Sequence, residues 1–259
     1  MTATREFIVV TKLSPLNQAI RVLGELLITL GVIVFLFIPY ELWFTGLYTE
    51  HAQAQFKRQL AQSWASPSPA ASPASGATAS TGPTGPSPSS VPTPTAAAVG
   101  PVVLPGDAIG IIRIPRLGAN YAYVIVQGVS TDDLKKGPGH YPGTADPGGI
   151  GNFVVSGHRT TYLAPFNGLG ELAVGDAIVI ETRDTYYTYQ VTTIQTVLPT
   201  DVAVVLPVPG QPRATPTQAL ITLTTCTPKY SASHRLIVSG LLESALPKSA
   251  GLPPALKGS

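Results

Sequence analysis

The most informative stretch of this chain is Ile221-Thr-Leu-Thr-Thr-Cys226-Thr-Pro-Lys-Tyr-Ser-Ala-Ser-His234-Arg235-Leu-Ile-Val238, which contains the one cysteine of the sequence. Residues 221–225 are uncharged and mostly β-branched, which is typical of a β-strand that ends at Cys226. A polar loop follows, and the apolar pattern resumes at Arg235, so the two segments are predicted to pair as a hairpin. Cys226 and Arg235 would then face each other at the strand ends, where a thiol and a guanidinium can form a reaction centre.

The composition is uneven and excludes several classes of protein. Of the 259 residues only 12% are charged and 26 are proline, which is unusual for one compact soluble fold. The formal net charge is +2, and there is no basic run with interleaved aromatic residues, so no nucleic-acid partner is expected. One cysteine excludes an intramolecular disulfide and a multi-cysteine zinc site. The lone thiol is either a reactive group or a small buried hydrophobic side chain.

A long apolar segment lies near the N-terminus. Between Leu26 and Leu47 the one charged residue is Glu41, and about 20 apolar residues suffice to cross a bilayer as a helix. We expect a transmembrane helix at 19–48 that contacts lipid through this segment, after a cytoplasmic tail at 1–18. A cleaved signal peptide is the alternative, but no small-x-small cleavage site follows the run directly. The expected location is therefore the cell membrane, in a single pass, with the rest of the chain outside the cytoplasm.

Residues 49–100 are predicted to form a juxtamembrane and linker region. A polar helix at 49–62 would extend from the membrane. From Ser63 to Gly100 the chain is mainly Ala, Ser, Pro, Thr and Gly, and no charge occurs between Arg58 and Asp107. Such a segment cannot bury enough apolar surface to fold. A disordered tether is the prediction.

Residues 101–246 are predicted to form one β domain, followed by a disordered tail at 247–259. The expected strands are 108–114, 122–126, 151–157, 177–182, 185–198, 219–225 and 235–242, most of them separated by Gly, Pro, Asn or Asp. Short helices are expected at Ser130–Lys135 and Pro165–Leu172. Seven or eight short strands favour an all-β barrel or sandwich.

A catalytic thiol needs a neighbouring group that generates or stabilises the thiolate, and histidine is the usual one. Of the four histidines, His51 lies beside the predicted membrane segment, outside the β domain. His234 directly precedes Arg235, and alternation along a strand would point these two side chains to opposite faces. Neither is the preferred partner.

His158 is the preferred base. It follows the apolar strand that ends at Gly157 and therefore stands at a strand end, as Cys226 does. His140, in the turn-rich segment Gly137-Pro-Gly-His-Tyr-Pro-Gly, is the alternative base. A purely structural histidine is the non-catalytic interpretation of either.

Three motifs resemble those of one family, the sortases. Thr222-Leu-Thr-Thr-Cys226 resembles the sortase signature Thr-Leu-x-Thr-Cys, and Arg235 opens the strand that follows it in that family. Ser156-Gly-His158 resembles the family's histidine motif, and Gly139-His-Tyr-Pro-Gly-Thr144 resembles the loop before it. The resemblance extends over the whole β domain. It implies a closed eight-stranded β-barrel with one or two short helices and an active site at strand ends.

The segment His158-Arg-Thr-Thr-Tyr162, together with Tyr141, resembles the class E branch found in Gram-positive actinobacteria. Class E members resemble one another in preferring a Leu-Ala-x-Thr-Gly sorting signal to the commoner Leu-Pro form. The resemblance implies that Tyr141 contacts the second residue of the signal, and Thr224 and Thr225 are expected to line the same groove. Each also has a plain interpretation, as a turn tyrosine or as ordinary strand residues.

The reaction implied by the resemblance is transpeptidation. Cys226 would attack the Thr–Gly carbonyl of a sorting signal on a secreted protein and form a thioacyl enzyme. His158 would protonate the leaving glycine amine and then deprotonate the incoming nucleophile, while Arg235 would contact the substrate or the developing oxyanion. The incoming amine would belong to a peptidoglycan precursor or cross-bridge, so the product would be a protein joined to the cell wall.

No cofactor and no metal is expected. No acidic cluster resembles the calcium site of some class A members, and Asp132-Asp133 is expected to cap a short helix instead.

Two other functions stay open. L,D-transpeptidases and secreted cysteine peptidases also use Cys and His, but signatures of the type Ser-x-Gly-Cys or Cys-Gly-x-Cys do not occur here. The second alternative is a membrane-tethered, non-catalytic β domain that binds a cell-wall polymer or protein, with Cys226 buried and inert. Accessibility of the thiol distinguishes that class from an enzyme.

Overall fold

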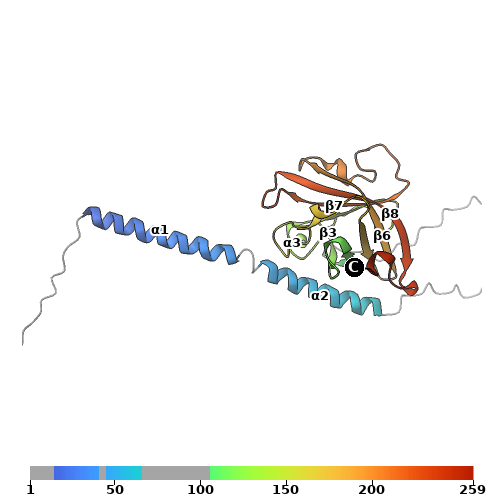
Figure 1. The fold of residues 1–259 in the computed structure, drawn as a ribbon, viewed down its shortest axis with the longest axis horizontal. Coiled ribbons are helices and arrows are strands. Elements are labelled where there is room, and N and C mark those ends of the chain that lie inside the picture. The colour runs from blue at the N-terminus through green and yellow to red at the C-terminus, as the bar shows by residue number, and fades with distance from the viewer. Residues whose placement is uncertain (1–14, 41–44, 66–105, 259) are drawn as a thin grey trace, which may run out of the picture. The chain divides into compact units, whose positions relative to one another are not determined.

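The computed structural model describes residues 15–40, 45–65 and 106–258 (Figure 1). The chain divides into two compact units, Met1–Thr45 and Gly46–Ser259. The first contains helix α1 (Pro15–Pro39), whose large apolar side chains are exposed. By length and composition α1 can cross a membrane, and it begins a few residues before the predicted span. The predicted linker lies outside the described residues from Ser66 onward.

The second unit is built around a β-barrel. Its strands are β1 (Ala108–Arg113), β2 (Tyr123–Gln127), β3 (Gly139–His140), β4 (Gly151–Ser156), β5 (Ala177–Glu181), β6 (Thr185–Val197), β7 (Ala219–Thr227) and β8 (His234–Pro247). They close in the order β1-β2-β3-β4-β7-β8-β6-β5. The prediction of a closed eight-stranded barrel is confirmed.

Strand β3 is the one strand that the sequence pattern did not predict. It has only two residues, inside a segment rich in glycine and proline, and so carries no periodic signal. It nevertheless pairs in parallel with β2 and antiparallel with β4. Without β3 the barrel wall would be open between these two strands.

Alternation along the strands separates a core face from an outer face. The buried cluster inside the barrel includes Phe153 and Val155 of β4, Ile221 and Leu223 of β7, and Leu236 and Val238 of β8. The residues between them face outward. On β7 these outward residues include Thr222, Thr224 and Cys226, so the predicted nucleophile is not part of the core.

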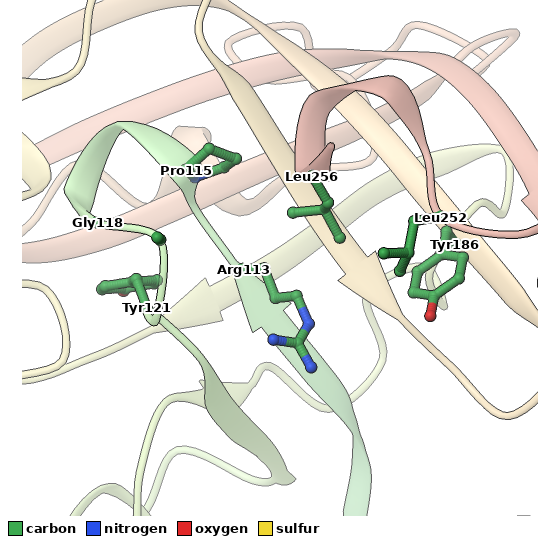
Figure 2. A pocket seen from close by; sticks show the side chains of 8 residues that line it. Arg113, Pro115, Gly118, Tyr121, Tyr186, Leu252 and Leu256 are labelled. Carbon is green, nitrogen blue, oxygen red and sulfur yellow. The ribbon is translucent and has the colours of Figure 1, made fainter. Parts of the chain in front are cut away.

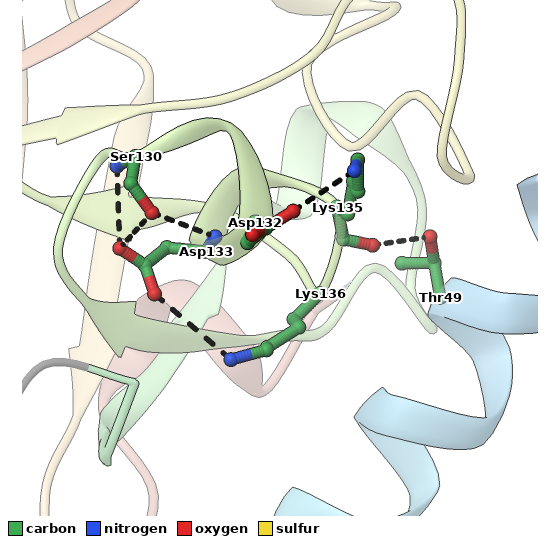
Figure 3. Close-up of polar contacts among 6 residues, drawn as sticks. All are labelled: Thr49, Ser130, Asp132, Asp133, Lys135 and Lys136. Carbon is green, nitrogen blue, oxygen red and sulfur yellow. Dashed lines mark hydrogen bonds and ion pairs between the residues drawn. The ribbon is translucent and has the colours of Figure 1, made fainter.

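The short helix α3 (Thr131–Leu134) begins with a capping box (Figure 3). Ser130 is the N-cap, and its hydroxyl accepts from the Asp133 N–H at 3.2 Å. In return, the Asp133 carboxylate accepts from the Ser130 N–H at 3.2 Å. These contacts satisfy amide donors that the helix itself cannot pair. Asp133 thus takes part in the cap as expected, whereas the N-cap is Ser130 and Asp132 pairs with Lys135 at 2.9 Å.

Helix α2 (Thr45–Ala65) is part of the β unit, although the sequence suggested only a polar helix that extends from the membrane. Gln53 accepts from the Val124 N–H at 2.7 Å and donates to the Val124 and Lys136 carbonyls at 3.0 and 2.9 Å. Leu60, Phe56 and Trp64 pack with Ile111 and Val124 of the barrel. The pattern hid this docking because two buried members of the stripe, Thr49 and Gln53, are polar.

The segment after Pro247 is ordered, so the prediction of a disordered tail is wrong. It forms two 3-10 helices, η5 (Lys248–Ala250) and η6 (Pro254–Leu256). The Lys248 N–H donates to the Asp184 carbonyl at 2.8 Å, and its ammonium lies 2.9 Å from Glu181. That ammonium also lies 3.7 Å from the centre of the Trp64 ring on α2. These partners are far away in the sequence, and local composition could not reveal them.

Candidate active site

Three adjacent strands bring Cys226, His158 and Arg235 to one end of the barrel. Cys226 of β7 is the register partner of Arg235 on β8. In the parallel β4–β7 pair, Ser156 is the partner of Thr224, and the Gly157 N–H donates to the Thr224 carbonyl at 3.1 Å. His158 follows the end of β4 by two residues, at the end where β7 carries Cys226. The adjacent ends of β4, β7 and β8 therefore carry the three predicted residues.

The same three residues belong to the outer face of the sheet. Because core residues alternate with outer ones, Cys226 and Arg235 fall on the outer face of the β7–β8 pair. His158 follows the outward-facing Ser156 by two residues. Cys226 is half-buried and is a free thiol. Cys226 and Arg235 thus share a face and a level, His158 follows the end of the adjacent strand, and all three side chains have partial access to solvent.

His158 has an incompletely satisfied imidazole. Its Nε2 is buried and has no hydrogen-bond partner among the described residues. The ring lies against that of Tyr162, with centroids 5.0 Å apart and the planes tilted by 33°. Burial lowers the pKa of His158 below its usual value of 6.5. The neutral imidazole is the favoured form, and it can accept a proton at an atom that no protein group occupies.

The backbone on both sides of His158 is fixed by Phe166, whose N–H donates to the His158 carbonyl at 3.0 Å. A Cβ on Gly157 would lie 2.7 Å from the Phe166 ring. Glycine is therefore required before His158, because any side chain there would displace the residue that holds the histidine backbone.

His140, the alternative base, has a different environment. Its Nδ1 lies 2.8 Å from Gln127 Oε1, and its Nε2 lies 2.9 Å from Thr144 Oγ1 and 3.1 Å from the Ala145 carbonyl. The ring also stacks on Phe153, at 4.9 Å between centroids. Burial lowers the pKa of His140, against an opposing contribution from the Ala145 carbonyl. With both ring nitrogens engaged, His140 is a structural histidine.

Arg235 lies at the loop end of the β7–β8 hairpin. Its Nη1 donates to the carbonyl of Ala232 in the loop, at 3.0 Å, and to that of His234 at the start of β8, at 3.1 Å. These two bonds orient the cation through its own loop and leave other donors of the guanidinium available.

A second arginine touches the site. Arg159 donates from Nη1 to the Cys226 carbonyl at 3.2 Å, and its Nε is buried with no hydrogen-bond partner among the described residues. Asn167 donates to the Arg159 carbonyl at 2.9 Å and accepts from the Lys229 ammonium at 2.7 Å. This chain of contacts ties the loop after β4 to the loop after Cys226. Arg159 belongs to the segment His158-Arg-Thr-Thr-Tyr162, but nothing in its sequence position predicts a contact with Cys226.

Comparison with known proteins identifies the family. The family model described as "Sortase domain" matches residues 112–243. Sortase SrtE1 of Streptomyces coelicolor is 35% identical over 247 residues, which is 92% of this chain and 61% of that protein. The chain belongs to the sortase family. The resemblance to class E is confirmed by the solved sortase E of Streptomyces avermitilis, with 41% identity and a TM-score of 0.55, which covers 60% of this chain and 99% of that one.

The sortase E1 of Streptomyces coelicolor has also been solved with a tripeptide in its active site. That structure is 37% identical, with a TM-score of 0.55, and covers 60% of this chain and 99% of that one. This chain spans less than two thirds of the length of Streptomyces coelicolor sortase SrtE1.

The remaining predicted residues of this sortase have distinct positions. Thr224 is on the outer face of β7, two residues before Cys226. Thr225 is on the core-facing side, and its hydroxyl donates to the Gly157 carbonyl at 2.7 Å, a position that does not support groove lining. Tyr141 follows β3, and its N–H donates to the Val154 carbonyl at 2.9 Å, further along β4 from the His158 end.

A separate pocket of about 200 Å³ lies elsewhere in the sortase (Figure 2). It is lined by Arg113, Pro115, Gly118, Ala119, Tyr121, Tyr186, Leu252 and Leu256, and includes none of the predicted site residues. Leu252 and Leu256 belong to the ordered C-terminal segment, which forms part of its wall. No group of three or more metal-ligating side chains occurs among the described residues of the sortase.

Proposed function

We propose that this sortase is a membrane-anchored cysteine transpeptidase that cleaves a Leu-Ala-x-Thr-Gly-like sorting signal between Thr and Gly. The observation that carries the proposal is that Cys226 and Arg235 are register partners at the end of β7 and β8, and that His158 follows the end of the adjacent strand β4 by two residues. A base, a nucleophile and a cation, in the order of the strands β4, β7 and β8, are the groups that acyl transfer needs.

The first half-reaction forms a thioester. His158 accepts the proton of the Cys226 thiol, and the resulting thiolate attacks the carbonyl carbon of the Thr–Gly bond, so that a tetrahedral oxyanion forms. The intermediate collapses with cleavage of the C–N bond, and His158 donates a proton to the leaving glycine amine. Arg235 stabilises the oxyanion or clamps the substrate, because a fixed cation acts most strongly in a partly dry site.

The second half-reaction reverses these roles. An incoming amine attacks the thioester carbonyl, His158 accepts the proton from that amine, and the Cys226 thiolate leaves. The amine belongs to a peptidoglycan precursor or cross-bridge, so the product is a secreted protein joined to the cell wall. The tripeptide in the active site of the related sortase E1 supports a peptide substrate.

Recognition of the signal falls to the outer face beside the site. Thr224 lines the groove next to Cys226, and Tyr141 contacts the second residue of the signal. Thr225 contributes indirectly, since its hydroxyl holds the Gly157 carbonyl just before His158.

The membrane anchor is α1. Its large apolar side chains are exposed over most of its length, which is the pattern of a helix surrounded by lipid. With the N-terminus in the cytoplasm, the barrel acts outside the membrane, where secreted proteins and cell-wall amines meet it.

The test is a transpeptidation assay with the full chain in detergent micelles. A Leu-Ala-x-Thr-Gly peptide and an amine should give cleaved and amine-linked products, and Cys226→Ala and His158→Ala should abolish both. Equal rates with Leu-Pro-x-Thr-Gly would remove the signal preference from the proposal. An unreactive Cys226 towards a methanethiosulfonate reagent, with no product from either peptide, would leave the non-catalytic binding domain as the better account.

A further inference from the structure

The loop that follows His158 contains an unusual turn. Tyr162, Leu163 and Ala164 all have positive φ angles, of 53°, 59° and 43°. Non-glycine residues rarely adopt this left-handed conformation, and three in succession persist only where surrounding contacts enforce them. The first of the three, Tyr162, is the residue whose ring lies on His158.

Contacts from the barrel hold this turn in place. The Ala164 N–H donates to the Thr161 carbonyl at 2.8 Å within the turn. From β2 and the segment before it, the Tyr123 hydroxyl donates to the Leu163 carbonyl at 3.3 Å, and the Tyr121 hydroxyl donates to the Pro165 carbonyl at 2.7 Å. The turn is thus anchored by two tyrosines that have no other assigned purpose in the site.

The start of α2 packs against the left-handed turn. A Cβ added to Gly46 would lie 3.7 Å from the Leu163 side chain, so α2 begins against the left-handed turn. Thr49 of α2 donates to the Lys135 carbonyl at 2.6 Å (Figure 3). These contacts connect the start of α2 with the turn that contains Tyr162 and with the residue that ends α3.

We propose that Tyr162 is a positioning residue for His158, and that α2 braces the left-handed turn that presents it. The role of Tyr162 rests on the proposed function, since it matters for turnover only if His158 is the acid and base. The Tyr162 ring covers one face of the imidazole, excludes water from it and restricts its rotation. The brace makes the juxtamembrane helix a part of the catalytic fold.

The groups around His158 make this proposal measurable. The titratable group that contacts the His158 ring is Tyr162. Arg159 of the same loop donates to the carbonyl of Cys226 at the end of the adjacent strand β7, and Arg235 is the register partner of Cys226 on β8. Burial is the cause that lowers the pKa of His158. Removing the ring that buries it should therefore raise that pKa toward 6.5, whereas a change that only loosened a distant part of the fold would not.

The experiment titrates His158 by NMR in the full chain, labelled with ¹³C at histidine, in detergent micelles and in the Cys226→Ala background. The His158 signal is assigned by its loss in His158→Ala. Tyr162→Ala should raise the His158 pKa, and Tyr162→Phe should leave it unchanged because the ring remains. In the active chain, Tyr162→Ala should lower kcat about tenfold or more with KM within about twofold, and Tyr162→Phe should restore kcat.

An unchanged His158 titration in Tyr162→Ala would overturn the positioning role. This outcome is distinct from failure of the proposed function, which would appear as full activity of His158→Ala and does not depend on the titration. Gln53→Ala, which removes the central bond of the α2 dock, should shift the His158 titration in the same direction but less. If Gln53→Ala lowers stability and leaves both the titration and kcat unchanged, α2 does not brace the turn.

Discussion

Two outer faces of the same barrel differ in whether their buried polar groups have hydrogen-bond partners. The face of β1 and β2 is covered by α2, and there Gln53 pairs with both the N–H and the carbonyl of Val124. The outer face of β4, β7 and β8 is left partly open at the strand ends, with buried nitrogens of His158 and Arg159 that lack hydrogen-bond partners among the described residues. Polar groups that serve stability are satisfied by the fold, and those left unsatisfied are candidates for chemistry.

His140 and His158 show the same contrast within a single residue type. Burial lowers the pKa of both, yet His140 has partners at both ring nitrogens and His158 does not. Burial alone therefore does not distinguish a catalytic histidine from a structural one. The hydrogen-bond partners do.

Replacing His158 and His140 one at a time should separate catalysis from stability, and the loss of activity in the His158 variant should be the largest effect of all. His158→Gln should reduce transpeptidation by about 10²–10⁴-fold, the range for loss of an acid–base group, with little change in the free energy of unfolding. His140→Gln should cost about 1–3 kcal/mol of stability, because Gln127, Thr144 and Ala145 lose a buried partner. Product formation and urea unfolding measure the two effects. The reverse assignment would follow if His140→Gln removed activity in a folded protein.

On the face covered by α2, replacing Gln53 should lower the stability of the protein. Gln53→Ala would leave the buried N–H and carbonyl of Val124 without their side-chain partner, which should lower the free energy of unfolding by about 2–4 kcal/mol. Gln55→Ala, on an exposed position of the same helix, is the matched control and should be neutral. Equal urea midpoints for the two variants would mean that α2 contributes nothing to the stability of the barrel.

The C-terminal segment should contribute less to the free energy of unfolding than Gln53 does. Lys248→Met removes the ammonium between the Trp64 ring and Glu181 and should lower the free energy of unfolding by about 1 kcal/mol. Lys257→Met, on an exposed lysine of the same segment, should leave the thermal midpoint unchanged. A neutral Lys248→Met would show that the tail is ordered without that contact.

The smallest effect should be on the pH dependence of stability. The pKa values of His158 and His140 are lowered in the fold, so the unfolded chain binds more protons than the folded one between those values and 6.5. Stability should therefore be unaffected by these groups above pH 6.5 and should fall as the pH decreases below it. Asp132, whose pKa is lowered mainly by its hydrogen bond to Lys135, titrates outside this window. Urea unfolding between pH 7.5 and 5.0 should show a shallower decline in the His158→Gln variant.

The sequence predicted the barrel well because most strands carry their own signal. β7 and β8 are rich in β-branched and aliphatic residues with alternating burial, and turn residues bound most of the other strands. Cys226, His158 and Arg235 could be selected as well, since each stands at the end of such a strand. β3 could not be predicted, because two residues in a glycine- and proline-rich segment have no periodicity.

Other features depended on partners distant in the chain. The pairing of Gln53 with Val124 joins residues 71 positions apart, and the stripe that docks α2 is hidden by polar residues. The C-terminal segment has a composition that suggests disorder and is ordered by Asp184, Glu181 and Trp64. Arg159 and Tyr162 are in the histidine motif, but nothing in their spacing shows that one contacts Cys226 and the other covers His158.

The sequence by itself determined most of the strands, the apolar helix and the three groups at the strand ends, because strand periodicity, apolar length and residue chemistry are local properties. Only the tertiary structure decided which histidine stays unpartnered, which arginine touches the nucleophile, and that α2 and the C-terminal segment belong to the fold. The physical reason is that hydrogen-bond satisfaction depends on which groups the folded chain brings together, and those groups come from segments that are far apart in the sequence.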